Sequence, residues 1–205
     1  IPDDVYIQVL IPARKELIAK SVEALQGEKK AIFHIYNPTN EFQRRVVFNK
    51  TDDEIVQLAV DGSSELKKLT QDFEGEVMYQ YSAESFSQTD LPFAAINLPN
   101  TLEACMPNVY ADRVEWMCTN LTNRENVIVS VHPHNDRGTA VASAEMAILA
   151  GADRIEGTIF GNGERAGNLD LVTVVFNIHT QGIDPEIDLS NIDEKLGLAL
   201  SKEEK

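Results

Sequence analysis

One short segment of the chain gathers side chains that can bind a metal ion or a charged ligand. His132 and His134 stand two positions apart at the end of a β-branched run, so both side chains point to the same side of an extended strand. Imidazoles placed in this way can bind one divalent cation, although two hydrogen-bonded loop histidines would give the same pattern. The adjacent Asn135 and Asp136 favour the metal, because amides and carboxylates commonly orient metal-bound imidazoles.

A glycine-rich segment, GTIFGNGERAGN, follows at residues 157–168. Glycines allow the backbone to come close to a ligand, and a helix that opens near Asn168 would offer free N–H groups to an anion. The segment is neither a dinucleotide-binding G-x-G-x-x-G motif nor a phosphate-binding loop with a lysine. A flexible turn with a surface ion pair between Glu164 and Arg165 is the simpler alternative for this segment.

Other polar side chains follow the ends of predicted strands. Ser82 and Glu84 come after one strand, and Asn97 and Thr101 after the next. Taken singly, each is also typical of a turn or a helix cap. His34 lies inside the strand IFHIY, where a lone histidine is usually a hydrogen-bonded core residue.

Short β-branched runs alternate with helical patterns along the chain. Strands are expected at 5–10, 31–36, 76–82, 94–99, 126–131 and 153–160. Helices are expected after the first strand up to Gly27, from Asp52 or Asp53, and at 107–121, 138–150 and 169–181. This alternation predicts right-handed βαβ units and a parallel sheet, either as a (β/α)8 barrel or as an open doubly wound sheet.

The distribution of polar residues favours the barrel, because its βα loops share one mouth whereas an open sheet binds ligands at one switch point. Six strands are nevertheless too few for a complete barrel. The segment 83–93 is also too short for a parallel crossover, which needs a dozen or more residues, and it has no helical pattern. We therefore expect the sequence to be joined across a missing helix near Phe93.

Composition excludes several classes of function. The chain has 205 residues and a formal net charge of −15, which argues against a broad surface for nucleic acid or an anionic membrane. Cys105 and Cys118 form no metal-like spacing and no disulfide framework, so a reducing, cytoplasmic location is expected. The sequence has no apolar run of transmembrane length and no signal-peptide pattern. Because it does not start with Met, we expect it to be a fragment.

Taken together, the motifs resemble those of a known family. The segment HPHNDRGTAVASAEMAILAGADRIEGTIFGNGERAGN is similar to the signature of α-isopropylmalate synthases. These enzymes share a barrel superfamily with homocitrate synthase, citramalate synthase and hydroxymethylglutaryl-CoA lyase. The resemblance continues upstream through AIFHIYNPTNEFQRRVVF, YSAESFSQTD and INLPNTLEACMPNVYADRVEWM, and downstream through GIDPEIDLSNID, so it covers essentially the whole chain.

The resemblance implies a (β/α)8 TIM barrel whose third to eighth strands lie within residues 1–182, followed by the start of a linker at 183–205. It implies that the strand carrying an Arg-Asp pair, one helix and a regulatory domain lie outside the chain. The implied reaction is a metal-dependent condensation of acetyl-CoA with 2-oxoisovalerate, carried out by a homodimer. A sister synthase acting on another keto acid, or an incomplete fragment serving as a scaffold, remains an alternative.

The resemblance also implies a role for each motif residue. His132, His134 and Asn168 would hold a divalent cation such as Zn, Mn, Mg or Co. His34, Ser82 and Thr101 would line the keto-acid pocket, and Glu84 would lie near the reacting carbon. The positions implied on the acetyl-CoA side are Asn97, Glu164 and Gly167.

Overall fold

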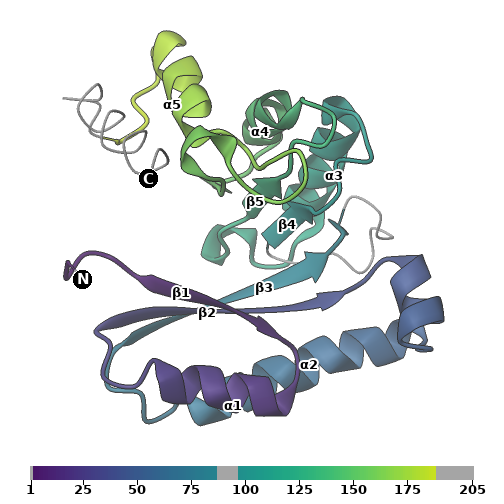
Figure 1. Cartoon of the computed structure of the whole chain (residues 1–205), viewed down its shortest axis with the longest axis vertical. Coiled ribbons are helices and arrows are strands. Elements are labelled where there is room, and N and C mark those ends of the chain that lie inside the picture. Colours follow the sequence, from purple (N-terminus) through teal and green to yellow (C-terminus); the bar gives the residue numbers. More distant parts are fainter. Residues whose placement is uncertain (1, 87–96, 188–205) are drawn as a thin grey trace.

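The computed structural model describes residues 2–86 and 97–187, and its centre is one parallel sheet of six strands (Figure 1). The strands are β1 (Ile7–Pro12), β2 (Lys30–Pro38), β3 (Glu76–Glu84), β4 (Asn97–Asn100), β5 (Ser130–Pro133) and β6 (Arg154–Ile155). Each strand pairs in parallel with the next one along the chain. A doubly wound sheet would reverse this order at its middle, so the uninterrupted order is that of a barrel wall.

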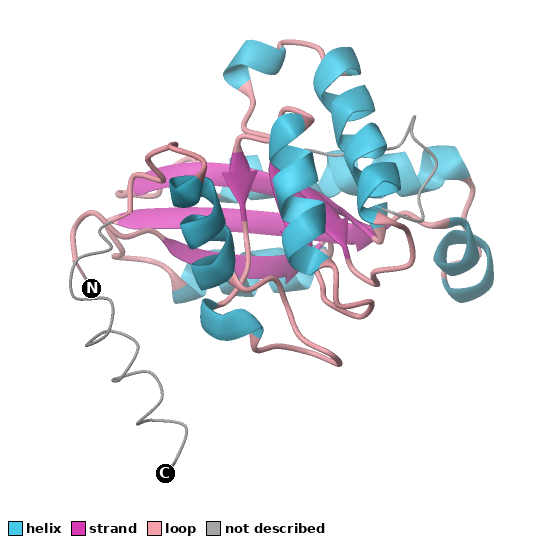
Figure 2. Ribbon diagram, turned by 90° about the horizontal axis from the view of Figure 1, so that it is seen from above, coloured by secondary structure: helices cyan, strands magenta, loops and turns pink. Residues whose placement is uncertain are grey.

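Helices connect the strands and cover one face of the sheet. They are α1 (Lys15–Ala24), α2 (Asp52–Leu69), α3 (Pro107–Asn120), α4 (Ala140–Leu149) and α5 (Leu171–Thr180). Figure 1 places α1 and α2 against β1 to β3, while Figure 2, seen from above, shows some helices in front of the strands and others behind them. Short helical turns occur at Gln43–Val47, Arg124–Asn126 and Ile159–Gly161.

The start of α2 illustrates how the sequence sets these boundaries. Thr51 precedes the helix in an extended conformation, and its hydroxyl accepts a hydrogen bond from the Glu54 N–H at 3.3 Å. The Glu54 carboxylate accepts in return from the Thr51 N–H at 2.8 Å. This reciprocal capping box satisfies two N–H groups that would otherwise be unpaired at the helix start.

Successive side chains point to opposite faces of the sheet, as the two-residue period of a strand requires, and one face is mainly apolar while the other carries most of the polar groups. The apolar side chains pack against the helices in three clusters. One joins β1, β2, α1 and α2 around Phe33 and Ile18, and a second joins β4, β5, α3 and α4 around Leu98 and Val131. The third joins α4 and α5 around Leu169. The opposite, polar face carries the candidate site residues.

The structure confirms the parallel α/β architecture and places every expected helix, but the strands differ in extent from those expected. β1 is shifted by two residues, and β2 and β3 each end two residues later than expected, at Pro38 and Glu84.

The two short strands differ most. The strand expected at 126–131 begins only at Ser130, because 124–126 form a helical turn and Ile128 is exposed. The strand expected at 153–160 ends at Ile155, because the chain turns away and Thr158 pairs with Asp170. Apolar runs therefore located these strands, but they made β5 and β6 too long and β2 and β3 too short.

Two expectations fall on residues outside the described ranges. The missing helix near Phe93 lies in 87–96, and most of the linker expected at 183–205 lies in 188–205. The division at residue 182 stays a prediction, since α5 ends at Thr180. Among the described residues, no helix combines the length and apolar character needed to cross a membrane.

The packing of Phe33 generates a stability prediction. Its ring is fully buried and meets the Phe73 ring edge-on, with the ring centroids 5.7 Å apart. We expect Phe33→Ala to lower the free energy of unfolding by about 3–5 kcal/mol, because it leaves a cavity between β2 and its helices. The matched control is Phe42→Ala, whose ring is 69% exposed and whose effect should stay within about 0.5 kcal/mol. Denaturant unfolding of both variants measures the difference, and equal losses would contradict this account of the core.

Candidate functional site

A pocket of about 380 Å³ opens on the polar face of the sheet, at the carboxyl ends of the strands. Its lining comes from every strand or from the loop that follows it. The lining residues are Gln8, Leu10, His34, Tyr36, Ser82, Glu84, Asn97, Pro99, Thr101, His132, His134, Glu156 and Glu164. Of the ten residues that the sequence singled out, eight line this pocket. Asn168 forms a backbone bridge with the lining residue His134, and Gly167 is not part of the lining.

His34 and Ser82 form a buried pair between neighbouring strands. The Gln8 amide Nε2 lies 2.9 Å from His34 Nδ1, so Nδ1 accepts and the ring proton sits on Nε2. His34 Nε2 then donates to the Ser82 hydroxyl. Burial lowers the pKa of His34 to about 4, so the ring is neutral near pH 7. Because Ser82 accepts from His34, its own O–H remains available to donate to a ligand.

Glu84 and Thr101 line the same pocket as this pair. Glu84 is half-buried, and burial raises its pKa, which makes it a better base than an exposed carboxylate. The Thr101 hydroxyl oxygen accepts a hydrogen bond from the Ser85 N–H at 2.9 Å. This contact ties the loop after β4 to the end of β3 and holds both residues at the pocket.

His132 and His134 face the pocket side by side, with ring centroids 5.3 Å apart. His132 Nδ1 lies 3.3 Å from the Glu156 carboxylate, which assigns the ring proton to Nδ1 and leaves the Nε2 lone pair free. His134 is 8% exposed, and its pKa is lowered, first by burial and then by the nearby His132. The two rings therefore occupy different environments although they are only two residues apart.

Arg165 accounts for that difference. Its Nη2 lies 3.0 Å from His134 Nδ1, and since arginine only donates, Nδ1 must accept. The same guanidinium binds the Asp136 carboxylate at 2.7 Å and the Thr101 carbonyl, and its hydrogen bond holds the pKa of Asp136 at about 2. Sequence reasoning treated the Glu164–Arg165 pair as a possible surface feature, but Arg165 ties together three loops of the site.

Asn168 lies directly beside His134, with which it forms an isolated antiparallel bridge. Its side-chain oxygen Oδ1 is buried and has no hydrogen-bond partner. Gly163 is needed at this point, because a Cβ there would stand 2.1 Å from Asn168 Nδ2. The glycine thus lets the Asn168 amide pack under the loop, with an acceptor oxygen left over.

The residues present fit a divalent cation in part. His132 offers a free Nε2 and Asn168 an unpartnered oxygen, and both are donor types that such ions accept. His134 would bind through Nε2 only if its ring proton moved to Nδ1, in place of the bond from Arg165. The described part of the chain holds no group of three or more His, Cys, Asp or Glu side chains placed to bind a metal, so the donor set here is incomplete.

The three residues assigned to the acetyl-CoA side lie in different environments. Asn97 is 1% exposed, and its Oδ1 is buried without a partner. The Glu164 side chain is 80% exposed at the pocket edge. Gly167 has a φ of +116°, and a Cβ there would stand 2.5 Å from the Gly161 carbonyl, so only glycine fits.

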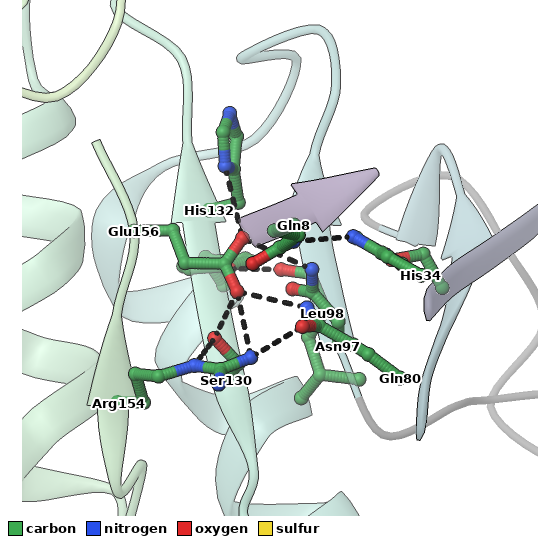
Figure 3. Close-up of polar contacts among 11 residues, drawn as sticks. Gln8, His34, Gln80, Asn97, Leu98, Ser130, His132, Arg154 and Glu156 are labelled. Carbon is green, nitrogen blue, oxygen red and sulfur yellow. Dashed lines mark hydrogen bonds and ion pairs between the residues drawn. The ribbon is translucent and has the colours of Figure 1, made fainter. Parts of the chain in front are cut away.

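Sequence reasoning assigned no role to the polar cluster beneath the pocket, which Figure 3 shows around the Glu156 carboxylate. Burial alone would raise the pKa of Glu156, but hydrogen bonds from His132, Ser130 and Gln80 together with the Arg154 charge lower it to about 2. One signal was present in the sequence. Arg154 and Glu156 are two residues apart in an extended segment at the end of β6, so their side chains point to the same side. Their partners lie on other strands, beyond the reach of local patterns.

Comparisons with known proteins agree with this geometry. Residues 1–196 match the family model described as HMGL-like. The chain is 52% identical to the 2-isopropylmalate synthase of Rhizobium johnstonii and 53% identical to that of Kineococcus radiotolerans, in each case over 94% of this chain. It spans only 38% and 37% of those two relatives, respectively.

A solved structure supports the barrel. The HMG-CoA lyase of Bacillus subtilis superposes with a TM-score of 0.66 over 93% of this chain and 70% of that chain, at 17% sequence identity. At that identity the likeness concerns the fold alone, and it agrees with the sequential strand order. The α/β barrel expected from the sequence is therefore confirmed, and the chain belongs to the HMGL-like family.

Proposed function

We propose that the protein containing this chain is a 2-isopropylmalate synthase, which condenses acetyl-CoA with 2-oxoisovalerate to give 2-isopropylmalate and CoA. The observation that carries the proposal is the pocket, where a neutral His34–Ser82 pair, a half-buried Glu84 and the two imidazoles of His132 and His134 converge. The names of the relatives, at about half identical residues, support the same reaction.

The keto acid would be held by neutral hydrogen-bond donors. The Ser82 hydroxyl has its proton free, since it already accepts from His34 Nε2. A hydroxyl in a half-apolar pocket binds a carboxylate or carbonyl oxygen without adding a charge of its own. Thr101 also lines the pocket, and Leu10 and Pro99 supply apolar surface for a branched side chain.

Glu84 is suited to take the proton from the acetyl methyl group. Burial raises its pKa, so the carboxylate is a stronger base than one in water. Once the proton has left, the methyl carbon bonds to the ketone carbon of the keto acid. The ketone oxygen takes the electron pair of the broken π bond and then a proton, and so becomes the hydroxyl of the product. Water then cleaves the thioester, which releases the CoA thiol and leaves the new carboxylate of the product.

A divalent cation bound at His132, His134 and Asn168 would act as a Lewis acid that polarises the ketone. This assignment is supported by the positions of the three residues: His132 lies on β5, His134 directly follows that strand, and Asn168 is bridged to His134. Asn97, Glu164 and Gly167 would face the acetyl-CoA. The buried Asn97 Oδ1 is an acceptor without a partner there.

The choice of keto acid gives the direct test of the proposal. In the full-length protein we expect kcat/KM to be highest for 2-oxoisovalerate and lower by modest factors for 2-oxobutyrate and pyruvate, because an apolar pocket discriminates by about 1–3 kcal/mol per methylene. Release of the CoA thiol measures the rate, and mass spectrometry identifies each product. A higher value for pyruvate or 2-oxoglutarate would make the protein a sister synthase, and no CoA release with any keto acid would refute the proposal.

The metal assignment is tested by His134→Ala. We expect turnover to fall by more than about 100-fold with the circular dichroism spectrum unchanged, beyond the 10–100-fold typical of residues that only support a metal site. The matched control is His179→Ala, since His179 is exposed in the last turn of α5, far from the pocket lining. Full activity in a folded His134→Ala protein would exclude a metal-ligand role for this residue.

The neutral state of His34 makes a prediction about pH. The folded ring has a pKa of about 4, whereas an unfolded histidine titrates near 6.5, so below pH 6.5 the unfolded chain binds a proton that the folded chain does not. This residue therefore destabilises the fold progressively as the pH falls from 6.5 to 4, by roughly 3 kcal/mol in total. Histidine NMR titration of the folded protein should show the His34 ring neutral down to pH 5. A folded pKa above 6 would contradict its assignment as a neutral donor.

A further inference from the structure

The Glu156 carboxylate contacts side chains from β3, β4, β5 and β6, more strand partners than the other pocket carboxylates have (Figure 3). Its two oxygens divide these partners. Oε1 accepts from Gln80 Nε2 at 2.8 Å, from Ser130 Oγ at 2.8 Å and from Arg154 Nη2 at 2.9 Å. Oε2 accepts from Asn97 Nδ2 at 3.2 Å and faces His132 Nδ1 at 3.3 Å.

The partners on Oε1 are themselves fixed. Arg154 donates through Nε to the Ser130 hydroxyl at 3.0 Å and through Nη2 to the side-chain amide oxygen Oε1 of Gln80 at 2.6 Å. Arg154, Ser130 and Gln80 therefore form a closed set of contacts with one carboxylate oxygen. Rotation of the Glu156 side chain would break several of these bonds at once. The contacts to Oε1 therefore also fix the position of Oε2.

A fixed acceptor at Oε2 decides the state of the neighbouring ring. Because Oε2 can only accept, His132 Nδ1 must carry the proton, and the lone pair is left on Nε2. At His134 the order is reversed, since Arg165 donates to Nδ1. Two histidines in one pocket are thus held in opposite tautomers by two different partners.

We propose that Glu156 is a positioning residue: anchored by Arg154, Ser130 and Gln80, it holds His132 in the Nδ1–H tautomer and presents the Nε2 lone pair to a cation in the pocket. This inference rests on the proposed function for the identity of the cation site. Its core, the tautomer of His132, is a property of the protein that does not depend on turnover.

The test uses the full-length protein labelled with 15N-histidine, in a buffer treated with a metal chelator. Long-range 1H–15N spectra distinguish the two neutral tautomers, and His132→Gln assigns the signal. We expect Nδ1–H at His132 in the wild type. In Glu156→Gln, with the side-chain amide directed at the ring, we expect His132 to change to Nε2–H. The control Glu115→Gln, on the exposed face of α3, should leave the spectrum unchanged.

A second measurement is the affinity for Zn²⁺, determined by competition with a chromophoric chelator. We expect Glu156→Gln to weaken binding by about 10–100-fold, as is typical when the partner of a metal-bound histidine is removed, and Glu115→Gln to have no effect. Glu156→Asp keeps the charge but shortens the side chain, and it should fall between the two. A merely structural role would lower stability without changing the tautomer.

Removing Glu156 alone leaves Arg154 without its carboxylate, and the variant can unfold for that reason. The double variant Arg154→Gln with Glu156→Gln removes both charges together and is then measured in its place. An Nε2–H tautomer at His132 in the wild type, or an unchanged tautomer and Zn²⁺ affinity in the folded variants, would overturn the inference. If these results appear as expected but no keto acid is turned over, the positioning role stands and the proposed function fails. If a keto acid is turned over but the tautomer and the Zn²⁺ affinity do not change in the variants, the proposed function stands and the positioning role fails.

Discussion

The rest of the structure depends on the two-residue alternation of side chains in a parallel sheet whose strands are all in sequential order. One face must be apolar to pack on the helices, and the chain places Phe33, Leu98 and Val131 there. The residues in between, each one position along the strand, point to the other face and are free to be polar. A slip of one residue in any strand would exchange the two faces, so the same register fixes both the core and the site.

Polar groups on the inner face are costly unless they are paired, and the described residues meet this cost by concentrating their charges. The interior ion pair between Arg154 and Glu156 is surrounded by Ser130, Gln80 and Asn97, which supply hydrogen bonds that water would otherwise provide. Higher in the pocket, Arg165 does the same for Asp136 and the loop carbonyl of Thr101. Two of the buried acceptors that have no partner among the described residues, Asn97 Oδ1 and Asn168 Oδ1, belong to the residues expected to face a ligand.

The same environment separates the protonation states of neighbouring groups. Burial lowers the pKa of His34, outweighing the opposite effect of the Glu156 charge, and it raises the pKa of Glu84, which keeps the ring neutral and makes the carboxylate more basic. Glu156 is also buried, yet its donors hold it ionised, with a pKa of about 2. Two carboxylates of one pocket are thereby suited to different tasks, one to accept a proton and the other to orient a ring.

The sequence by itself determined the alternation of strands and helices, and with it the parallel α/β fold, because apolar periodicity and capping residues such as Thr51 act locally. The family resemblance also grouped His132, His134 and Asn168, and the structure brings these three residues together, whereas their role as metal ligands stays a prediction. The sequence could not set the ends of the short strands. The start of β5 depends on the exposure of Ile128, and the end of β6 depends on the turn that pairs Thr158 with Asp170. Nor could it find the role of Glu156. That role depends on Gln80 and Ser130, which stand 76 and 26 residues away, and only the pairing of β3 to β6 brings them within hydrogen-bond distance.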